Sequence, residues 1–224
     1  LLNTGKDMVR SRTRLLATIA YRIAGETTYA LEGSVLSAGS TVQWLRDGLG
    51  LLSQASEISA LAAGADPESG VYLVPAFTGL GAPYWDADAR GAIIGLTRGA
   101  GRAEIAQAAI DSTAHQTCDL LDAMAGDGVT TKTLRVDGGM ARNDTVLQRL
   151  ADLTDIDVVR PKNTETTAWG AAFLAGLGAG LFRKLEDGRA IWKADREFKP
   201  ACEPAHRARM RAGWKDAVGR VRTG

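Results

Sequence analysis

The sequence predicts an α/β domain with a mixed sheet flanked by helices, and three observations support this prediction. A β-hairpin pattern opens the chain, helical periodicities follow it, and short strands alternate with helices in the second half. Strands separated by helices of that length indicate parallel crossovers, with the helices on the faces of the sheet. The hairpin adds an antiparallel pair, so the predicted sheet is mixed.

The N-terminal third predicts a hairpin and then two helices. Two short runs are rich in strand-forming residues, and Gly25 between them suits a tight turn. Apolar residues recur at helical spacing from Gly39 to Leu52, and an alanine-rich stretch follows. The opening Leu1-Leu2 pair is typical of a strand that enters a turn. The expected elements are strands over residues 15–21 and 27–31, a helix that starts at Gly39, and a helix over residues 55–63.

The rest of the chain alternates between strands and helices. Glycine and proline between residues 78 and 86 forbid a regular element, so an ordered loop is expected there. A long apolar repeat ends where Gly126 and Gly128 mark a helix terminus. The expected strands cover residues 71–77, 92–96, 134–136 and 158–160, and the expected helices cover residues 103–124, 144–153 and 166–177, with terminal helices after them.

Composition favours a single globular domain. The 224 residues are 45% apolar and 24% charged, which suffices for one core. The net charge of +1 gives no electrostatic footprint for nucleic acid or anionic lipid, so we expect neither as a partner. Basic residues cluster in residues 203–224, which we interpret as the solvated face of a terminal basic helix.

Several polar residues are weak candidates for chemistry. Cys118 and Cys202 lack metal-ligand spacing and make no disulfide framework, and no signal peptide or membrane span is evident. We therefore expect a cytoplasmic protein without a metal site. His115, Asp111 and Asp119 fall inside the long helix, and we interpret the two aspartates as solvent-exposed or capping residues rather than general bases.

The strongest motif is Asp137-Gly138-Gly139, which ends a strand and leads into a helix. Glycine lets a ligand approach the backbone and permits a positive φ, and the N-terminus of a helix offers unpaired N–H groups. Ligands gather at the carboxyl ends of strands in open α/β sheets, and Asn143 could add a side-chain contact. The motif predicts a nucleotide site, with a simple tight turn capped by Asn143 as the alternative.

Two further stretches are open to more than one interpretation. Small residues open the helix at Gly39, and Gln43 lies one turn along the same face, where it could bind a nucleotide. An exposed glutamine on an ordinary helix is the alternative. Residues 161–172 favour a structural role, with Thr164 or Glu165 as the helix cap and a glycine-alanine face against a neighbour.

The order of these segments resembles known proteins. A hairpin followed by βαβα order resembles the ribonuclease-H-like domain of actin- and hexokinase-type ATPases. Residues 74–86 (VPAFTGLGAPYWD) and then 90–99 (RGAIIGLTRG) resemble the FGGY carbohydrate kinase family, above all its members that phosphorylate glycerol. Further stretches fit that family in the same order, namely residues 29–33 (YALEG), 43–47 (QWLRD), 135–139 (RVDGG) and 165–172 (ETTAWGAA).

The resemblance implies transfer of the ATP γ-phosphoryl group to glycerol, giving sn-glycerol 3-phosphate and ADP, with Mg²⁺ required. Residues 1–224 would be the C-terminal nucleotide-binding domain, and the N-terminal substrate domain would be absent. By carry-over, Gly39 and Gln43 would border the ATP, and Gly139 and Asn143 would contact its adenosine side. We also expect a homo-oligomer.

The resemblance further implies that the glycerol-binding residues, the catalytic aspartate and the phosphate loops precede this chain. No catalytic residue or metal ligand is therefore expected here, and the isolated chain should be inactive. Two alternatives stay open. One is the C-terminal domain of another FGGY sugar or polyol kinase, such as a xylulokinase, and the other is a non-catalytic nucleotide-binding module.

Overall fold

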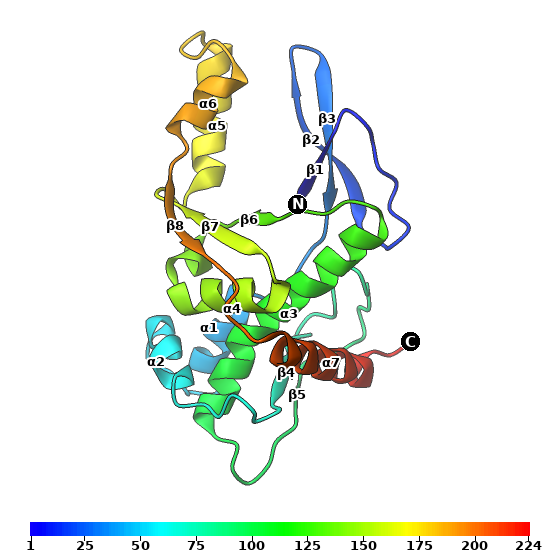
Figure 1. Ribbon diagram of the computed structural model, residues 1–224, viewed down its shortest axis with the longest axis vertical. Helices are drawn as coiled ribbons and strands as arrows, with labels where there is room; N and C mark the ends of the chain where they lie inside the picture. Colours follow the sequence, from blue (N-terminus) through cyan, green and yellow to red (C-terminus); the bar gives the residue numbers. More distant parts are fainter.

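The computed structural model describes residues 1–224 and contains three small β-sheets with helices between them (Figure 1). The first sheet, in the order β1-β3-β2, and the second, the pair β4-β5, are antiparallel. The third sheet has the order β6-β7-β8, with β6 and β7 parallel and β7 and β8 antiparallel. The predicted α/β class with a mixed sheet flanked by helices is confirmed.

The elements follow the predicted order closely. The strands are β1 Leu2–Gly5, β2 Leu16–Ile23, β3 Glu26–Glu32, β4 Tyr72–Val74, β5 Ala92–Ile94, β6 Thr133–Arg135, β7 Asp157–Pro161 and β8 Ala194–Phe198. The helices are α1 Gly39–Asp47, α2 Ile58–Ala62, α3 Arg102–Gly126, α4 Asp144–Thr154, α5 Thr166–Gly178, α6 Leu185–Ile191 and α7 Pro204–Val221. Short 3₁₀ turns, η1 Ala55–Glu57 and η2 Gly139–Arg142, precede α2 and α4.

Helix α3 runs through the middle of the molecule and connects its parts (Figure 1). Its first half packs with α1, α2 and β4, its central residues pack with α4, β7 and β8, and its last turns pack under the β2–β3 hairpin. Glu104 accepts a hydrogen bond from the N–H of Gly101, at 2.7 Å, and so stabilises the start of the helix. One long helix therefore holds both ends of the fold in place.

Two predicted elements differ from the structure. Apolar spacing predicted a first helix that continues toward Leu52, but α1 ends at Asp47 because Gly48 follows and Gly50 has a φ of +62°. The strands expected over residues 134–136 and 158–160 are parallel as predicted, but strand β8, which pairs antiparallel with β7, was not expected. Every residue of β8 except Phe198 is exposed, so the strand carries no apolar alternation.

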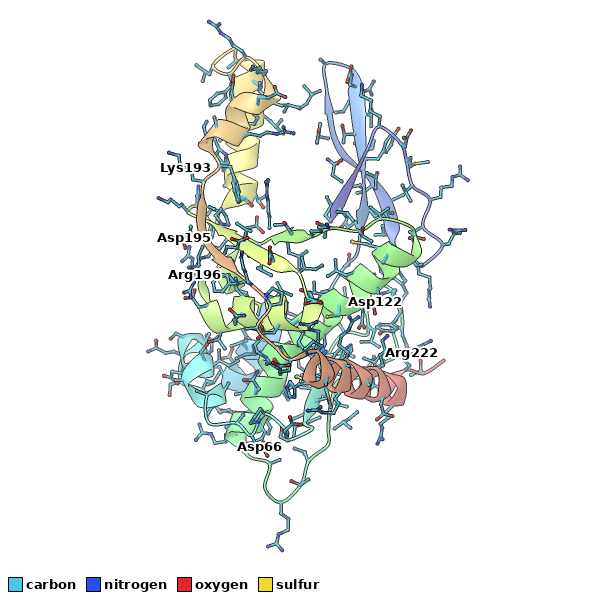
Figure 2. The ribbon with its side chains drawn as sticks, viewed as in Figure 1. Asp66, Asp122, Lys193, Asp195, Arg196 and Arg222 are labelled. Atoms are coloured by element: carbon cyan, nitrogen blue, oxygen red, sulfur yellow. The ribbon has the colours of Figure 1, made fainter.

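The terminal basic helix is observed as α7, and ion pairs hold much of its basic face. Trp214 is buried on its inner side. Arg211 lies 2.6 Å from Asp122 of α3, and Lys215 lies 3.6 Å from the same carboxylate, which is labelled in Figure 2. Arg207 pairs with Asp155 at 2.8 Å. The cluster of positive charge is thus used to dock α7 onto α3 and the end of α4.

Helix α5 differs from its expected packing. Thr164 or Glu165 was predicted to cap it, but neither side chain does so, and Glu165 instead pairs with Arg142 at 3.3 Å. The predicted contact of its glycine-alanine face is largely absent, because no atom of another element lies within 4 Å of the point where a Cβ on Gly170 would stand, and only Phe173 and Gly176 are buried. Figure 1 shows α5 and α6 projecting from the same end of the molecule as the β2–β3 hairpin.

Candidate functional site

A pocket of about 710 Å³ brings the two glycine-containing motifs together. All four residues singled out in the sequence, Gly39, Gln43, Gly139 and Asn143, line it, although nearly a hundred residues separate the two pairs along the chain. The other lining residues are Val42, Ala55, Ser56, Ile58, Ser59, Met140, Arg142, Asp144, Thr145 and Val146. The fold therefore brings together four predicted residues that are far apart in the sequence.

Met140 is the side chain that joins the two motifs. It packs against the core formed by α1, α2 and α3, which includes Val42 and Ile58. Its Cγ and Sδ atoms lie 3.7 Å from the point where a Cβ on Gly39 would stand, which is ordinary van der Waals contact. The N-terminus of α1 is thereby held against the turn that precedes α4, and the floor of the pocket is apolar.

The two glycines of the Asp137-Gly138-Gly139 motif have different roles. Gly138 has a φ of +79°, in the left-handed region that favours glycine, and its N–H donates to the carbonyl of Thr164 at 2.9 Å. Gly139 is exposed, and no protein atom lies within 4 Å of the point where its Cβ would stand. Asp137 lies outside the pocket lining. Gly138 thus shapes the turn, and Gly139 leaves backbone accessible at the pocket.

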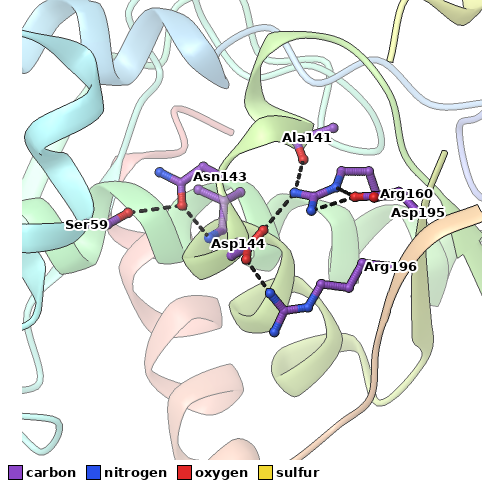
Figure 3. Close-up of polar contacts among 8 residues, drawn as sticks. Ser59, Ala141, Asn143, Asp144, Arg160, Asp195 and Arg196 are labelled. Atoms are coloured by element: carbon purple, nitrogen blue, oxygen red, sulfur yellow. Dashed lines mark hydrogen bonds and ion pairs between the residues drawn. The ribbon is translucent and has the colours of Figure 1, made fainter. Parts of the chain in front are cut away.

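Asn143 caps α4 and is tied to α2 (Figure 3). Its Oδ1 accepts the N–H of Val146 at 3.2 Å and the hydroxyl of Ser59 at 3.0 Å. An amide oxygen has two lone pairs, so these two donors use its capacity. The Nδ2 group has no partner in the chain and remains able to donate hydrogen bonds. The predicted cap and the predicted pocket residue are the same side chain.

Arg160 of β7 supports the turn on its other side (Figure 3). Its guanidinium donates to the carbonyl of Ala141 at 3.2 Å and lies 2.7 Å from Asp144 and 2.8 Å from Asp195. Arg196 of β8 also pairs with Asp144. The Arg160 side chain is only 15% exposed, so these contacts are screened less than ordinary surface ion pairs. Strands β7 and β8 therefore fix the position of η2.

Ser59 and Arg160 were not predicted from the sequence. Ser59 lies on a five-residue helix whose position depends on packing against α3, and nothing in its neighbourhood distinguishes it from other serines. Arg160 had a usable signal, since it lies near the carboxyl end of a strand, where ligand sites of α/β sheets gather. Both residues form hydrogen bonds to partners that are distant in sequence, Ser59 to Asn143 and Arg160 to Ala141.

The interpretation of the two α3 aspartates as exposed or capping residues is wrong. Both lie mid-helix and are buried. Asp111 accepts a bidentate pair of hydrogen bonds from Arg149, at 2.6 and 2.9 Å, and Asp119 accepts the indole N–H of Trp214 at 2.8 Å. Burial raises the pKa of Asp119 to about 6. The two carboxylates join α3 to α4 and α7.

The structure contains no group of three or more His, Cys, Asp and Glu side chains that could hold a metal ion. None of its helices combines the length and the apolar character that crossing a membrane requires.

Comparison with known proteins gives consistent matches. Residues 2–179 match the model of the FGGY family of carbohydrate kinases, C-terminal domain. A glycerol kinase of Rhodospirillum centenum is 57% identical over 224 residues and one of Brucella ovis is 58% identical over 226 residues, and each match covers the whole chain. The chain spans only 45% of the length of these relatives.

Solved structures agree with the sequence matches. The crystal structure of Plasmodium falciparum glycerol kinase with ADP superimposes with a TM-score of 0.87 at 34% identity, over 98% of this chain and 44% of that one. A gluconate kinase from Lactobacillus acidophilus, at 24% identity, has a TM-score of 0.80 and supports the ribonuclease-H-like fold alone. The chain therefore belongs to the FGGY family of carbohydrate kinases and matches its C-terminal domain.

Proposed function

We propose that this chain is the ATP-binding C-terminal half of a glycerol kinase, and that the pocket lined by Gly39, Gln43, Gly139 and Asn143 is its nucleotide site. The observation that carries the proposal is the convergence of these four residues in one pocket. The same half of the Plasmodium falciparum relative superimposes closely, and that protein was crystallised with ADP.

The pocket fits a nucleotide in size and in chemistry. Its volume of about 710 Å³ is in the range of small-molecule sites, which are mostly apolar with a few placed polar groups. Val42, Ile58 and Met140 offer an apolar surface to a planar base. The free Nδ2 of Asn143 and the exposed amide of Gln43 can hydrogen-bond to polar edges. The exposed backbone at Gly139 permits close approach.

In this proposal the chain binds and orients the nucleotide and carries no catalytic base. Phosphoryl transfer depends mainly on positioning and charge stabilisation, so a rigid nucleotide site is a substantial contribution. Mg²⁺ usually binds through phosphate oxygens, waters and one or two carboxylates, and when bound it neutralises charge on the transferred group. The described residues contribute no preformed metal cage to it.

A glycine substitution tests the proposed nucleotide site. Gly139→Val adds a branched side chain at the pocket, and no protein atom lies within 4 Å of the point where its Cβ would stand. We expect ADP affinity, measured by calorimetry, to fall at least about tenfold, which corresponds to about 1.4 kcal/mol. Gly219→Val is the matched control, because Gly219 also has open space around it but lies on α7, away from the pocket. Equal ADP binding by the two variants would contradict the assignment.

The choice of glycerol as substrate needs the full-length protein. Phosphorylation of glycerol, xylulose and gluconate is compared at equal ATP concentration, because related family members act on the latter two. We expect glycerol to have the highest kcat/KM, as the similarity to glycerol kinases suggests. A preference for xylulose would replace the proposed substrate and leave the nucleotide site intact. Absence of nucleotide binding would favour the non-catalytic alternative.

A further inference from the structure

Arg142 is the only cationic residue that lines the proposed nucleotide pocket. It also lines an adjoining polar pocket of about 490 Å³, whose lining includes Lys162 and Glu165, and no other residue lines both pockets. The arginine therefore stands at the boundary between the two pockets, at one side of the space proposed for the nucleotide.

The backbone of Arg142 is fixed, whereas its side chain is held weakly. Its neighbours Ala141 and Asn143, both labelled in Figure 3, are tied by hydrogen bonds to β7 and α2. The Arg142 guanidinium makes one hydrogen bond, to Glu165 at 3.3 Å, and the two side chains are 67% and 65% exposed. An exposed ion pair of this kind contributes little to stability, so Arg142 can exchange its partner at small cost.

The apolar floor of the pocket indicates where a base would lie. Val42, Ile58 and Met140 pack in one core cluster, so they cover one face of a planar ligand. Phosphate groups disfavour such a surface, because removing their charge from water is costly, and the floor therefore suits the base. Met140 and Arg142 belong to the same short turn, η2, which places the base within reach of the arginine side chain.

The pocket lining contains no aromatic residue to cover the second face of the base. A guanidinium is planar, always charged, and stacks on aromatic faces. Among the lining residues only Arg142 carries such a group. Asn143, the next residue, can at the same time donate from Nδ2 to the edge of the base. The two adjacent side chains thus suit a face and an edge of the same ring system.

We propose that Arg142 is a nucleotide-binding residue, whose guanidinium moves from Glu165 to stack on the face of the base opposite the apolar floor. Glu165 then competes with the nucleotide for Arg142. This inference rests on the proposed nucleotide site, and it adds to that site a residue that the glycine motifs did not indicate.

Calorimetry on the full-length protein tests the stacking by comparing ADP with adenosine. Arg142→Ala should weaken the binding of both about three- to tenfold and by the same factor, because stacking involves the base alone. Arg189→Ala is the matched control and should change neither affinity, since Arg189 is also exposed but lies on α6 and lines neither pocket. A loss for ADP alone would show that Arg142 contacts phosphate groups, and this result would overturn the proposal.

Glu165→Gln tests the competition. Neutralising Glu165 weakens its hold on Arg142, so ADP and adenosine should both bind about two- to fivefold more tightly. Adenosine is the decisive probe, because it is uncharged and does not respond to a general loss of negative charge. The gain should vanish when Glu165→Gln is combined with Arg142→Ala. No gain for adenosine, or an equal gain in both backgrounds, would contradict the competition.

The same titrations separate this inference from the nucleotide site on which it rests. If the wild-type protein binds no ADP, the site is refuted and the role of Arg142 with it. If the wild-type protein binds ADP and Arg142→Ala binds ADP and adenosine as tightly, the nucleotide site stands and Arg142 does not contact the nucleotide.

Discussion

Asn143→Asp separates helix capping from ligand binding at one side chain. Oδ1 of Asn143 accepts from Val146 and Ser59, and an aspartate retains that acceptor in the same place. Asn and Asp are about equal as N-caps, and a negative charge near a helix N-terminus is favourable by a few tenths of a kcal/mol. The free energy of unfolding of Asn143→Asp should therefore stay within about 0.5 kcal/mol of wild type.

Asn143→Ala should behave differently in the same assay. It removes the cap, which costs about 1 kcal/mol, and leaves the Ser59 hydroxyl without its acceptor, which adds on the order of 0.5–1 kcal/mol. Urea denaturation should therefore show a loss of about 1.5–2 kcal/mol. Ser59→Ala alone should account for the smaller part, and the double variant Ser59→Ala/Asn143→Ala measures the coupling between the two side chains.

The affinity for ADP should fall in Asn143→Asp, even though the stability of this variant should not. The group of Asn143 left free for a ligand is Nδ2, a donor, and Asn143→Asp replaces it with a negatively charged acceptor. We expect ADP to bind about tenfold more weakly, or about 1.4 kcal/mol, although the protein is as stable as wild type. If ADP affinity is unchanged in Asn143→Asp, Asn143 is a helix cap only. If Asn143→Asp is as unstable as Asn143→Ala, capping through Oδ1 is wrong.

Three further predictions concern the supports of the site and the buried histidine. Gly138→Ala should cost about 1–2 kcal/mol in urea denaturation because of its positive φ, whereas Gly139→Ala should cost little. Arg160→Met should cost on the order of 1 kcal/mol and weaken ADP binding, since η2 loses its tie to β7; unchanged ADP affinity would show that the tie is not needed. The folded protein excludes the proton that unfolded His115 binds below about pH 6.5, so stability should fall as the pH drops from there toward about 3. His115→Phe should reduce that fall by a few kcal/mol between pH 7 and 4, and identical pH profiles would contradict the neutral imidazole.

Local chemistry explains why the conformation of the glycine turn and the start of α4 could be predicted. The glycine turn lies between a strand and a helix that are adjacent in sequence, and Gly138 adopts the positive φ that its residue type suggests. Asn143 begins α4 as an N-cap, which is also a local property. Both alternatives considered for Asn143 are structurally compatible, because capping uses its oxygen and leaves its nitrogen free.

Long-range pairing explains what the sequence did not reveal. Asp111 and Asp119 follow a helical pattern that resembles a solvated face until Arg149 and Trp214, from two other helices, approach them. Strand β8 is stabilised by its pairing with β7, not by an apolar face. Its acidic and basic residues resemble a loop in isolation. In each case the partner lies at least 33 residues away, so no local window contains the cause.

The arrangement around η2 indicates that the proposed nucleotide site is formed before any ligand arrives. Ser59 holds Asn143 from α2, Arg160 holds Ala141 from β7, and Met140 packs into the core between them. The Nδ2 of Asn143, which has no internal partner, and the exposed backbone at Gly139 both line the pocket. A site whose supporting contacts are already made loses little conformational entropy on binding, and more of the contact energy then contributes to affinity.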